Sequence, residues 1–411
     1  MTGRRSVSFP SAAPSTMAAD TARKPVFMAW QASNTFGWGI AGVNLFCHWA
    51  VSREIQPYMK HPISEGDLLA LGPVRRWRVA GCVARSNEFA KRLAAARSGA
   101  VSLDIPVIHA LGNRDVDARA RITGRRNIGR MVFEETRLED WPEQIKRYDA
   151  VVCASRWNAE VLRARFGCDP VVIHEGVDPS LFHPAPKSDL LDPNRFYVFT
   201  GGKIELRKAQ DLVLLAFRRF SARHGDAMLV TAWHSPFDHR SVGFSGKLAA
   251  AIEMGADKRL AITKWAADNG IDPGKVIDVG AIPNQMMPHV LREMDCALQP
   301  SRAEGGTNFV AMEAMACGLP VIVASNTGSG DLIDGANCIP LLRQGPVEHP
   351  QDRGTEGWGE SDVDEIVAAL EALYRSTEQR RRVGAAGAEF MRRRTWAGHA
   401  AALARVVLSS S

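Results

Sequence analysis

Residues 301–321, SRAEGGTNFVAMEAMACGLPV, follow an apolar run at 295–300 and carry a pair of glycines near their start. The run at 295–300 is typical of a buried strand, and Thr307 or Asn308 can cap the start of a helix. Gly318 can end that helix, because glycine readily adopts the left-handed conformation found after helix C-termini. The segment therefore predicts a strand, a glycine-containing loop and a short helix in direct succession.

Two glutamates stand out in this segment. Glu313 is the one charged residue in the apolar run 309–317, so a helix here would be apolar on all sides and buried. A buried carboxylate needs a partner, which is either a ligand hydroxyl or a donor of the protein itself, and we expect the ligand hydroxyl. Glu304 precedes Gly305 and Gly306 at the predicted helix N-terminus, where backbone N–H groups and the helix dipole favour a phosphate.

Short apolar runs alternate with helical patterns along most of the chain, which predicts an α/β fold with two parallel, doubly wound sheets. In the first half these runs are 25–30, 105–111, 128–133, 150–155 and 170–176, and in the second half they are 196–202, 227–233, 276–282, 295–300 and 320–325. Two Rossmann-like domains of this kind face a central cleft formed at the carboxyl ends of their strands.

The composition of the connecting segments suggests the domain boundaries. Residues 1–24 are rich in Ser, Pro and Ala, so we expect a disordered tail. The first wound domain is expected at 25–184, and the polar, Pro-rich stretch that begins at 183 leads into a second domain at 185–385. A helix in 386–411 is expected to pack back toward the first domain.

Length and residue usage narrow the class of protein. A chain of 411 residues predicts two domains, because one hydrophobic core rarely serves so many residues. No run approaches the roughly 18 to 20 apolar residues of a membrane-spanning helix, and no secretory signal is recognisable, so we expect a cytoplasmic protein. The seven cysteines are scattered and include no C-x-x-C pair, which indicates buried thiols rather than a disulfide framework or a metal site.

Positive charge is concentrated in the first half of the chain. Residues 1–184 carry 25 Lys and Arg against 18 Asp and Glu, whereas 185–411 carry 26 against 27. The basic stretches 75–99 and 119–130 offer a surface to an anionic partner, either a lipid headgroup at the inner face of the plasma membrane or a phosphorylated acceptor. Nucleic acid is not expected, because no recognition motif accompanies the charge. The alternative is an ordinary solvated basic face.

Several segments resemble family 4 glycosyltransferases, which are retaining enzymes of the GT-B fold. The most specific is PSRAEGGTNFVAMEAMACGLPVIVASNTG at 300–328, and GGKIELRKAQDLVLLAF at 201–217 resembles the family segment that clamps the donor diphosphate. GVDPSLFHP at 176–184, the stretch 278–301 and Trp396 match further parts in the expected order. The resemblance spans about residues 150–400.

The resemblance implies that residues 25–184 form the acceptor-side domain and that 185–385 form the nucleotide-sugar-binding domain. It also implies roles for individual residues. Glu304 would lie near the transferred sugar and Glu313 would hold the nucleotide ribose, with eight residues between them where the family usually has seven. Lys203 and Lys208 would bind the diphosphate, with Lys203 in place of the usual Arg, and the adjacent Arg207 would compensate. The remaining donor-binding residues in this segment would be Gly305, Gly306, Thr307 and Asn308.

A second glycine pattern, GWGIAG at 37–42, follows the first predicted strand. It satisfies the G-x-G-x-x-G fingerprint of dinucleotide-binding dehydrogenases, but the bulky Trp38 lies where the dinucleotide would approach the backbone. The family resemblance implies instead that Gly37, Gly39 and Gly42 form a loop that faces the donor phosphates. A purely structural glycine turn is the third interpretation.

Residues 105–150 hold the candidates for acceptor chemistry. His109 interrupts an apolar strand, where it is either catalytic or a core histidine whose hydrogen bonds are satisfied. Glu134 and Glu135 follow the next strand, and we expect one of them, Glu134 by preference, to orient an acceptor hydroxyl. The alternative is an acidic start of a helix.

These observations favour a retaining glycosyltransferase that moves a sugar from a nucleotide-diphosphate sugar to a glycan, a lipid-linked or a small-molecule acceptor. The nucleotide sugar is a co-substrate, and no other cofactor and no metal site are expected, because no D-x-D pair lies in a suitable loop. Two alternatives stay open, a nucleotide-sugar epimerase of the same fold and a non-catalytic sugar-nucleotide binder.

Overall fold

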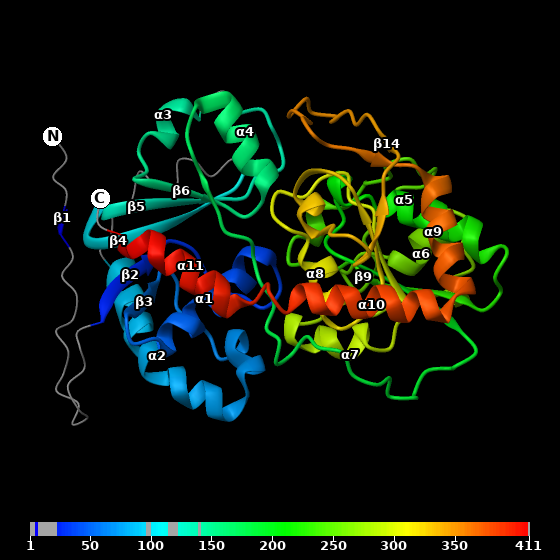
Figure 1. Ribbon diagram of the computed structural model, residues 1–411, viewed down its shortest axis with the longest axis horizontal. Helices are drawn as coiled ribbons and strands as arrows, with labels where there is room; N and C mark the ends of the chain where they lie inside the picture. The colour runs from blue at the N-terminus through cyan, green and yellow to red at the C-terminus, as the bar shows by residue number, and fades with distance from the viewer. Residues whose placement is uncertain (1–4, 7–22, 96–99, 114–121, 139–140, 410–411) are drawn as a thin grey trace. The chain divides into compact units, whose positions relative to one another are not determined.

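The computed structural model describes residues 5–6, 23–95, 100–113, 122–138 and 141–409, and it divides into two compact units (Figure 1). Unit 1 comprises Met1–Glu175 and Trp396–Ser411, and unit 2 comprises Gly176–Thr395. Each unit is a wound α/β domain with its own core, and the two are described separately.

Unit 1 is built on a parallel sheet with the strand order β3-β2-β4-β5-β6-β7. The strands are β2 (Lys24–Met28), β3 (Ile55–Met59), β4 (Val101–Leu111), β5 (Ile122–Met131), β6 (Ala150–Cys153) and β7 (Val171–Val172). The helices are α1 (Gly37–Val51), α2 (Gly72–Ala95), α3 (Pro142–Ile145), α4 (Arg156–Phe166) and α11 (Trp396–Leu408), and the 3₁₀ helix η1 (Gly66–Leu71) leads into α2. Buried apolar residues run through Val26–Met28 of β2 and through most of β4 from Ile105, as expected of parallel strands covered on both faces. β5 differs, because it is polar and only partly buried before Ile128.

Helix α11 completes unit 1 from the far end of the chain. It packs along α1, and the indole Nε1 of Trp49 donates to the backbone carbonyl of Ala400 at 3.0 Å. Leu403 and Val407 are buried in the same core cluster as Phe46. Unit 1 is therefore discontinuous in sequence.

Unit 2 contains a second parallel sheet, with the strand order β10-β9-β8-β11-β12-β13. Its strands are β8 (Phe196–Gly201), β9 (Ala227–Ala232), β10 (Val276–Asp278), β11 (Cys296–Gln299), β12 (Val321–Ala324) and β13 (Ile339–Leu341). Its helices are α5 (Gln210–Ser221), α6 (Ile262–Asp268), α7 (Met287–Leu291), α8 (Phe309–Ala316), α9 (Val363–Arg375) and α10 (Thr377–Met391). The strand order reverses between β8 and β11, and open α/β sheets bind ligands at this switch point, beyond the carboxyl ends of the strands.

The segment that opened the sequence analysis forms the predicted strand, loop and helix. Asn308 caps α8, because its side-chain oxygen accepts from the backbone N–H of Ala311 at 3.2 Å. Gly318 follows the helix with a φ of +80°, the left-handed conformation that glycine adopts without strain. The prediction of two doubly wound Rossmann-like domains is confirmed, and the predicted cleft between them stays a prediction.

The unit boundaries differ from those expected from composition. The expected boundary at 184/185 lies at Glu175/Gly176, because Val177 pairs with Thr395 and Phe182 is buried in the core of unit 2. The returning segment begins at Trp396 rather than at 386, because α10 packs against α8 within unit 2.

The expected disorder of residues 1–24 concerns a segment that is largely outside the described residues. Where it is described, the prediction is wrong at β1 (Arg5–Ser6), which pairs with Val101 and Ser102 of β4, and at Lys24, which begins β2. None of the described helices is both long enough and apolar enough to cross a lipid bilayer.

Candidate functional site

Two loops at the switch point of unit 2 bring the predicted donor-binding residues together. The loop after β8 carries Arg207 and Lys208 on the 3₁₀ helix η3 (Leu206–Lys208), and the loop after β11 carries Glu304. Gly202, with a φ of +105°, turns the chain directly after β8. Residues almost 100 positions apart in sequence thus meet at one edge of the sheet.

Glu304 is buried and accepts hydrogen bonds from four side chains. The ammonium of Lys208 lies 2.7 and 2.8 Å from its two oxygens, and Nη1 of Arg207 lies 3.0 Å from Oε2. The hydroxyl of Ser301 and the amide of Asn308 donate to Oε1 at 2.7 and 2.8 Å. Asn308 therefore holds both the N-terminus of α8 and the carboxylate in front of it.

This arrangement fixes the charge of Glu304. Burial alone would raise the pKa of a carboxyl group, but Lys208 and Arg207 outweigh burial and hold the pKa of Glu304 below its usual value. Burial lowers the pKa of Lys208, and the attraction of Glu304 opposes that change. The loops present cations that are already ordered by an ionised carboxylate.

Glu205 forms the outer part of this cluster, although no pattern in the sequence marks it. One of its oxygens lies 2.5 Å from the ammonium of Lys203 and the other lies 2.9 Å from Nε of Arg207. Burial opposes ionisation of Glu205, but Arg207 and then Lys203 hold its pKa below the usual value. Lys203 and Arg207, which were both predicted to bind the donor diphosphate, are thus paired with a carboxylate of the same loop.

Glu313 lies on α8, buried, as its apolar neighbours predicted. Its Oε1 accepts from the side-chain amide of Asn284, so the protein supplies a donor of its own, which is the alternative to a ligand hydroxyl. Burial raises the pKa of Glu313 to about 8, and the Asn284 hydrogen bond offsets only part of this effect. The carboxyl group is mostly protonated at pH 7, and its contact with a ribose stays a prediction.

The glycine pair is packed tightly against the 3₁₀ helix η7 (Thr327–Leu332). Gly305, Gly306 and Thr307 are all buried. A Cβ at Gly328 would lie 2.0 Å from the carbonyl oxygen of Gly306, and the Gly328 N–H donates to the carbonyl of Glu304 at 2.9 Å. The Thr307 hydroxyl lies 2.9 Å from the sulfur of Met312. The loop backbone is therefore fixed, and its contact with a donor stays a prediction.

Arg302 is a further residue of this loop that the sequence analysis did not single out. Its guanidinium makes two hydrogen bonds to the carboxylate of Asp211 on α5, at 2.9 and 2.7 Å, and a third to Glu360 at 2.9 Å. Arg302 and Asp211 are both almost fully buried. The pair ties the loop after β11 to the helix that follows Lys208, so it holds the two halves of the cation cluster in register.

The glycines of GWGIAG do not form a loop. Gly37, Gly39 and Gly42 lie in the first turns of α1, and the loop between β2 and α1 ends before them. A Cβ at Gly39 would lie 2.3 Å from Cβ of Ser33, and one at Gly42 would lie 2.8 Å from Nε1 of Trp30. Their placement in a loop is wrong, because these glycines admit the preceding loop against the helix. Their contact with the donor phosphates stays a prediction.

The acceptor-side candidates differ in where they lie along the strands of the unit 1 sheet. His109 is buried within β4, where its Nε2 lies 3.2 Å from the amide oxygen of Asn127 and its ring packs edge-on against Tyr148. Glu134 and Glu135 follow β5, and the amide oxygen of Asn113 accepts from both of their backbone N–H groups. These contacts favour a packing role for His109 and place the glutamates at the carboxyl end of the sheet, where their role in acceptor binding stays a prediction.

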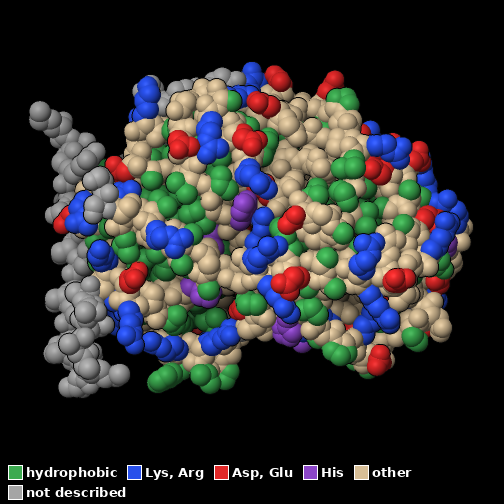
Figure 2. All heavy atoms as spheres, viewed as in Figure 1, with side chains coloured by type: hydrophobic (Ala, Val, Ile, Leu, Met, Phe, Trp, Pro, Cys, Tyr) green, Lys and Arg blue, Asp and Glu red, His purple; other side chains and the backbone are tan. Residues whose placement is uncertain are grey.

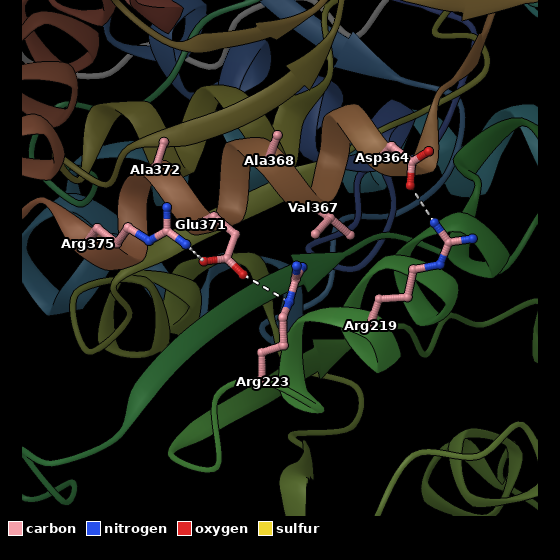
Figure 3. Close-up of a pocket in the computed structure, with 8 residues that line it drawn as sticks. All are labelled: Arg219, Arg223, Asp364, Val367, Ala368, Glu371, Ala372 and Arg375. Atoms are coloured by element: carbon pink, nitrogen blue, oxygen red, sulfur yellow. Dashed lines mark hydrogen bonds and ion pairs between the residues drawn. The ribbon is translucent and has the colours of Figure 1, made fainter.

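A separate surface pocket lies between α5 and α9 (Figure 3). Glu371 pairs there with Arg223 and Arg375, and Asp364 pairs with Arg219. Because α5 begins just after Lys208 and this pocket lies at its other end, the pocket is not part of the cation cluster. Within the described residues, no three His, Cys, Asp or Glu side chains gather closely enough to hold a metal ion.

Comparisons with known proteins agree with this geometry. Residues 195–375, which lie within unit 2, match the family model described as glycosyl transferases group 1. Curated protein sequences give no match. The similarity at the level of known sequence families is therefore to the domain that carries the cation cluster.

The whole chain is similar in structure to solved GT-B proteins. Sucrose-phosphate synthase from Thermosynechococcus elongatus aligns with a TM-score of 0.64 at 15% identity, covering 93% of this chain and 98% of that one. HepE from Anabaena in complex with UDP-glucose aligns with a TM-score of 0.63 at 14% identity, covering 93% and 99%. The galactosyltransferase WaaB aligns with a TM-score of 0.53 at 15% identity, covering 93% and 99%. At these identities the likeness shows the fold, which is GT-B.

Proposed function

We propose that this protein is a retaining glycosyltransferase of family 4 that uses a nucleotide-diphosphate sugar as donor. The observation that carries the proposal is the cluster of Lys203, Arg207 and Lys208 around two carboxylates at the switch point of unit 2. A pyrophosphate carries negative charge that such a cluster can neutralise, and the leaving group of sugar transfer is a nucleoside diphosphate. The group 1 domain match of residues 195–375 and the UDP-glucose bound to HepE support the same conclusion.

The main residues of the site have separate proposed tasks in the reaction. Lys208 and Arg207 stabilise the diphosphate as the bond between the sugar anomeric carbon and the phosphate oxygen breaks. Glu304 keeps these cations ordered before the donor arrives, so little reorganisation is needed during the reaction. Glu313 and Asn284 form a polar pair within an apolar region of α8, where they hold the nucleotide ribose.

The acceptor completes the transfer on the face that the diphosphate leaves. The acceptor hydroxyl oxygen bonds to the anomeric carbon, and its proton passes to a released phosphate oxygen, so the configuration is retained without a covalent enzyme intermediate. We propose that the cations perform the charge neutralisation without a metal ion. The acceptor is a glycan, a lipid-linked or a small molecule, and Glu134 is the proposed ligand of its hydroxyl.

The excess of positive charge in residues 1–184 supports peripheral association of the protein with an anionic surface at the cytoplasmic face of a membrane. A lipid-linked acceptor would be available at such a surface. Donor binding in unit 2 does not depend on this association.

The proposal is tested by donor binding and turnover with UDP-, GDP- and ADP-sugars, in the presence of a chelator. Lys208→Met should weaken binding of the matching nucleoside diphosphate by at least about tenfold, the effect of losing one charged hydrogen bond of ~1.5 to 3 kcal/mol. Lys264→Met is the matched control, because Lys264 is exposed on α6 and pairs with Asp268. Equal affinity of the two variants for every nucleotide would contradict the proposed site.

Product analysis separates the alternatives. Transfer to an acceptor with the donor's anomeric configuration supports the proposal, and an inverted product contradicts it. Epimerisation of the donor without an acceptor would establish the epimerase, and binding without turnover on any acceptor would establish a non-catalytic binder. Turnover that is abolished by the chelator and restored by a divalent metal would contradict metal independence.

A further inference from the structure

Three large hydrophobic side chains project from unit 1 within nine residues of sequence. Leu69 on η1 is 62% exposed, and Val74 and Trp77 in the first turns of α2 are 76% and 77% exposed. Figure 2 shows hydrophobic side chains projecting at the lower edge of the molecule, where α2 lies in Figure 1, with Lys and Arg side chains beside them. We call Leu69, Val74 and Trp77 the apolar tip.

The apolar tip is not needed for the fold of α2. The helix buries its opposite face through Val79, Cys82 and Phe89, which recur at helical spacing. Val74 and Trp77 are three residues apart, so they lie on one face of the first turns and away from that buried face. Most other exposed large hydrophobic residues of the described chain stand singly, as is normal for a protein surface. A cluster of three that the core does not use indicates a contact outside the chain.

Basic residues flank the apolar tip on its α2 side, whereas Glu65 and Asp67 precede it on the side of η1. Arg75 and Arg78 are exposed and Arg76 is half-exposed, between and directly after the apolar side chains. Farther along α2 the basic side chains continue, with Glu88 as the single acidic residue of the helix; they are Arg85, Lys91 and Arg92. The partner therefore combines an apolar phase with negative charge at its boundary.

A lipid bilayer with anionic headgroups has this combination. Trp prefers the membrane interface, and Arg interacts with headgroup phosphates while its stem contacts acyl chains. A second copy of the same face fits less well, because a two-fold contact would place the Arg75–Arg78 region against its own positive charge. A helix that carries charge throughout does not span the bilayer but lies at its surface.

We propose that the apolar tip inserts into the interface of an anionic membrane while Arg75, Arg76 and Arg78 bind lipid phosphates. This inference deepens the proposed peripheral association by naming the inserting side chains, and it is independent of sugar transfer. It predicts that both the apolar and the basic residues are required, because each supplies one part of the contact.

Cosedimentation of the full chain with vesicles tests the inference. The vesicles contain either phosphatidylcholine alone or phosphatidylcholine with roughly 30% phosphatidylglycerol. The second mixture imitates the negative charge of an anionic membrane leaflet. The wild type should bind the anionic vesicles and be released by about 0.5 M salt. Val74→Ser/Trp77→Ser should lower the partition coefficient by at least about tenfold, because two large apolar side chains no longer enter the membrane.

Matched variants separate insertion from a general effect of surface polarity. Leu190→Ser/Leu342→Ser removes two equally exposed hydrophobic side chains from unit 2 and should bind as the wild type does. Quenching of Trp fluorescence by brominated phosphatidylcholine should be stronger in the wild type than in Trp77→Phe. Unchanged binding of the Val74/Trp77 variant, equal binding of the wild type to neutral vesicles, or no binding would overturn the inference.

The same variants distinguish this inference from the proposed function. Val74→Ser/Trp77→Ser should retain wild-type affinity for the nucleoside diphosphate in solution, since it lies in unit 1 and the cation cluster lies in unit 2. Lost nucleotide binding in this variant would show that the substitutions act through the fold, and circular dichroism melting identifies that case. Self-association through the tip, seen as a dimer that the Val74/Trp77 variant abolishes, would overturn the membrane assignment.

Discussion

Glu313 should release a proton when a nucleotide binds. The pKa of its buried carboxyl group is raised to about 8, so at pH 7 about 0.9 of the molecules carry the proton. Hydrogen bonds donated by ribose hydroxyls favour the ionised form and lower the pKa of the bound state. If that pKa falls well below 7, binding at pH 7 releases about 0.9 proton.

The sign of the pH dependence follows from the same values. The pKa is lower in the complex than in the free protein, so rising pH favours the complex until the free carboxyl group is itself ionised. Nucleotide affinity should increase about tenfold per pH unit below pH 8 and level off above it. Glu313→Gln cannot ionise, so it should lack this dependence, and its affinity at pH 8 should be lower by the ~1.5 to 3 kcal/mol of a charged hydrogen bond.

Calorimetry in buffers of different ionisation enthalpy measures the released protons directly. UDP or the matching nucleoside diphosphate is titrated at pH 7 into the wild type and into Glu313→Gln, and the difference between the two proton counts cancels the titration of the phosphate itself. Glu389→Gln on α10 is the matched control, since Glu389 is exposed and pairs with Arg392. Equal proton release by the wild type and Glu313→Gln, or affinity that falls as the pH rises toward 8, would refute the reasoning.

Two further substitutions probe the loops of unit 2. Glu205→Gln removes two partly exposed ion pairs, with Lys203 and with Arg207, each worth at most about 1 kcal/mol. Calorimetry should then show nucleoside diphosphate binding that is tighter by roughly fivefold, whereas weaker binding would show that Glu205 orders the cations. Arg302→Met leaves the buried Asp211 carboxylate without its main partner and should lower the unfolding free energy of unit 2 by about 3 to 5 kcal/mol in urea denaturation, whereas Arg302→Met/Asp211→Leu should recover most of this loss; equal loss in both variants would assign the effect to packing.

The sequence predicted those parts of the fold whose causes are local. Asn308 and Gly318 mark the ends of α8 because the cap and the left-handed turn need only nearby residues. Strand β3 was missed, since its sequence IQPYM contains Gln56 and Pro57 and does not read as an apolar run. All five of its side chains are buried nonetheless. The strand tolerates Pro57 because it lies at the edge of the sheet, and the amide oxygen of Gln56 accepts a hydrogen bond from Arg85.

Most residues of the site could be predicted from the sequence, but their contacts with one another could not. Glu304 and Lys208 could be named from the segment patterns, whereas their mutual contact depends on a strand order that the sequence does not state. The partner of Glu313, Asn284, lies 29 residues earlier in a loop with no distinctive pattern. The glycine spacing of GWGIAG was misleading, because the same spacing serves a packed helix start as well as a phosphate loop.

The position of α11 has a consequence for how the chain is made. Unit 2 is continuous in sequence and is complete when Thr395 leaves the ribosome, but unit 1 still lacks the helix that covers α1. Until Trp396–Leu408 is synthesised, Phe46 and Trp49 lack the packing partners that Leu403 and Val407 later provide. Unit 1, which is synthesised first, can therefore complete its core only after the whole of unit 2 has been made.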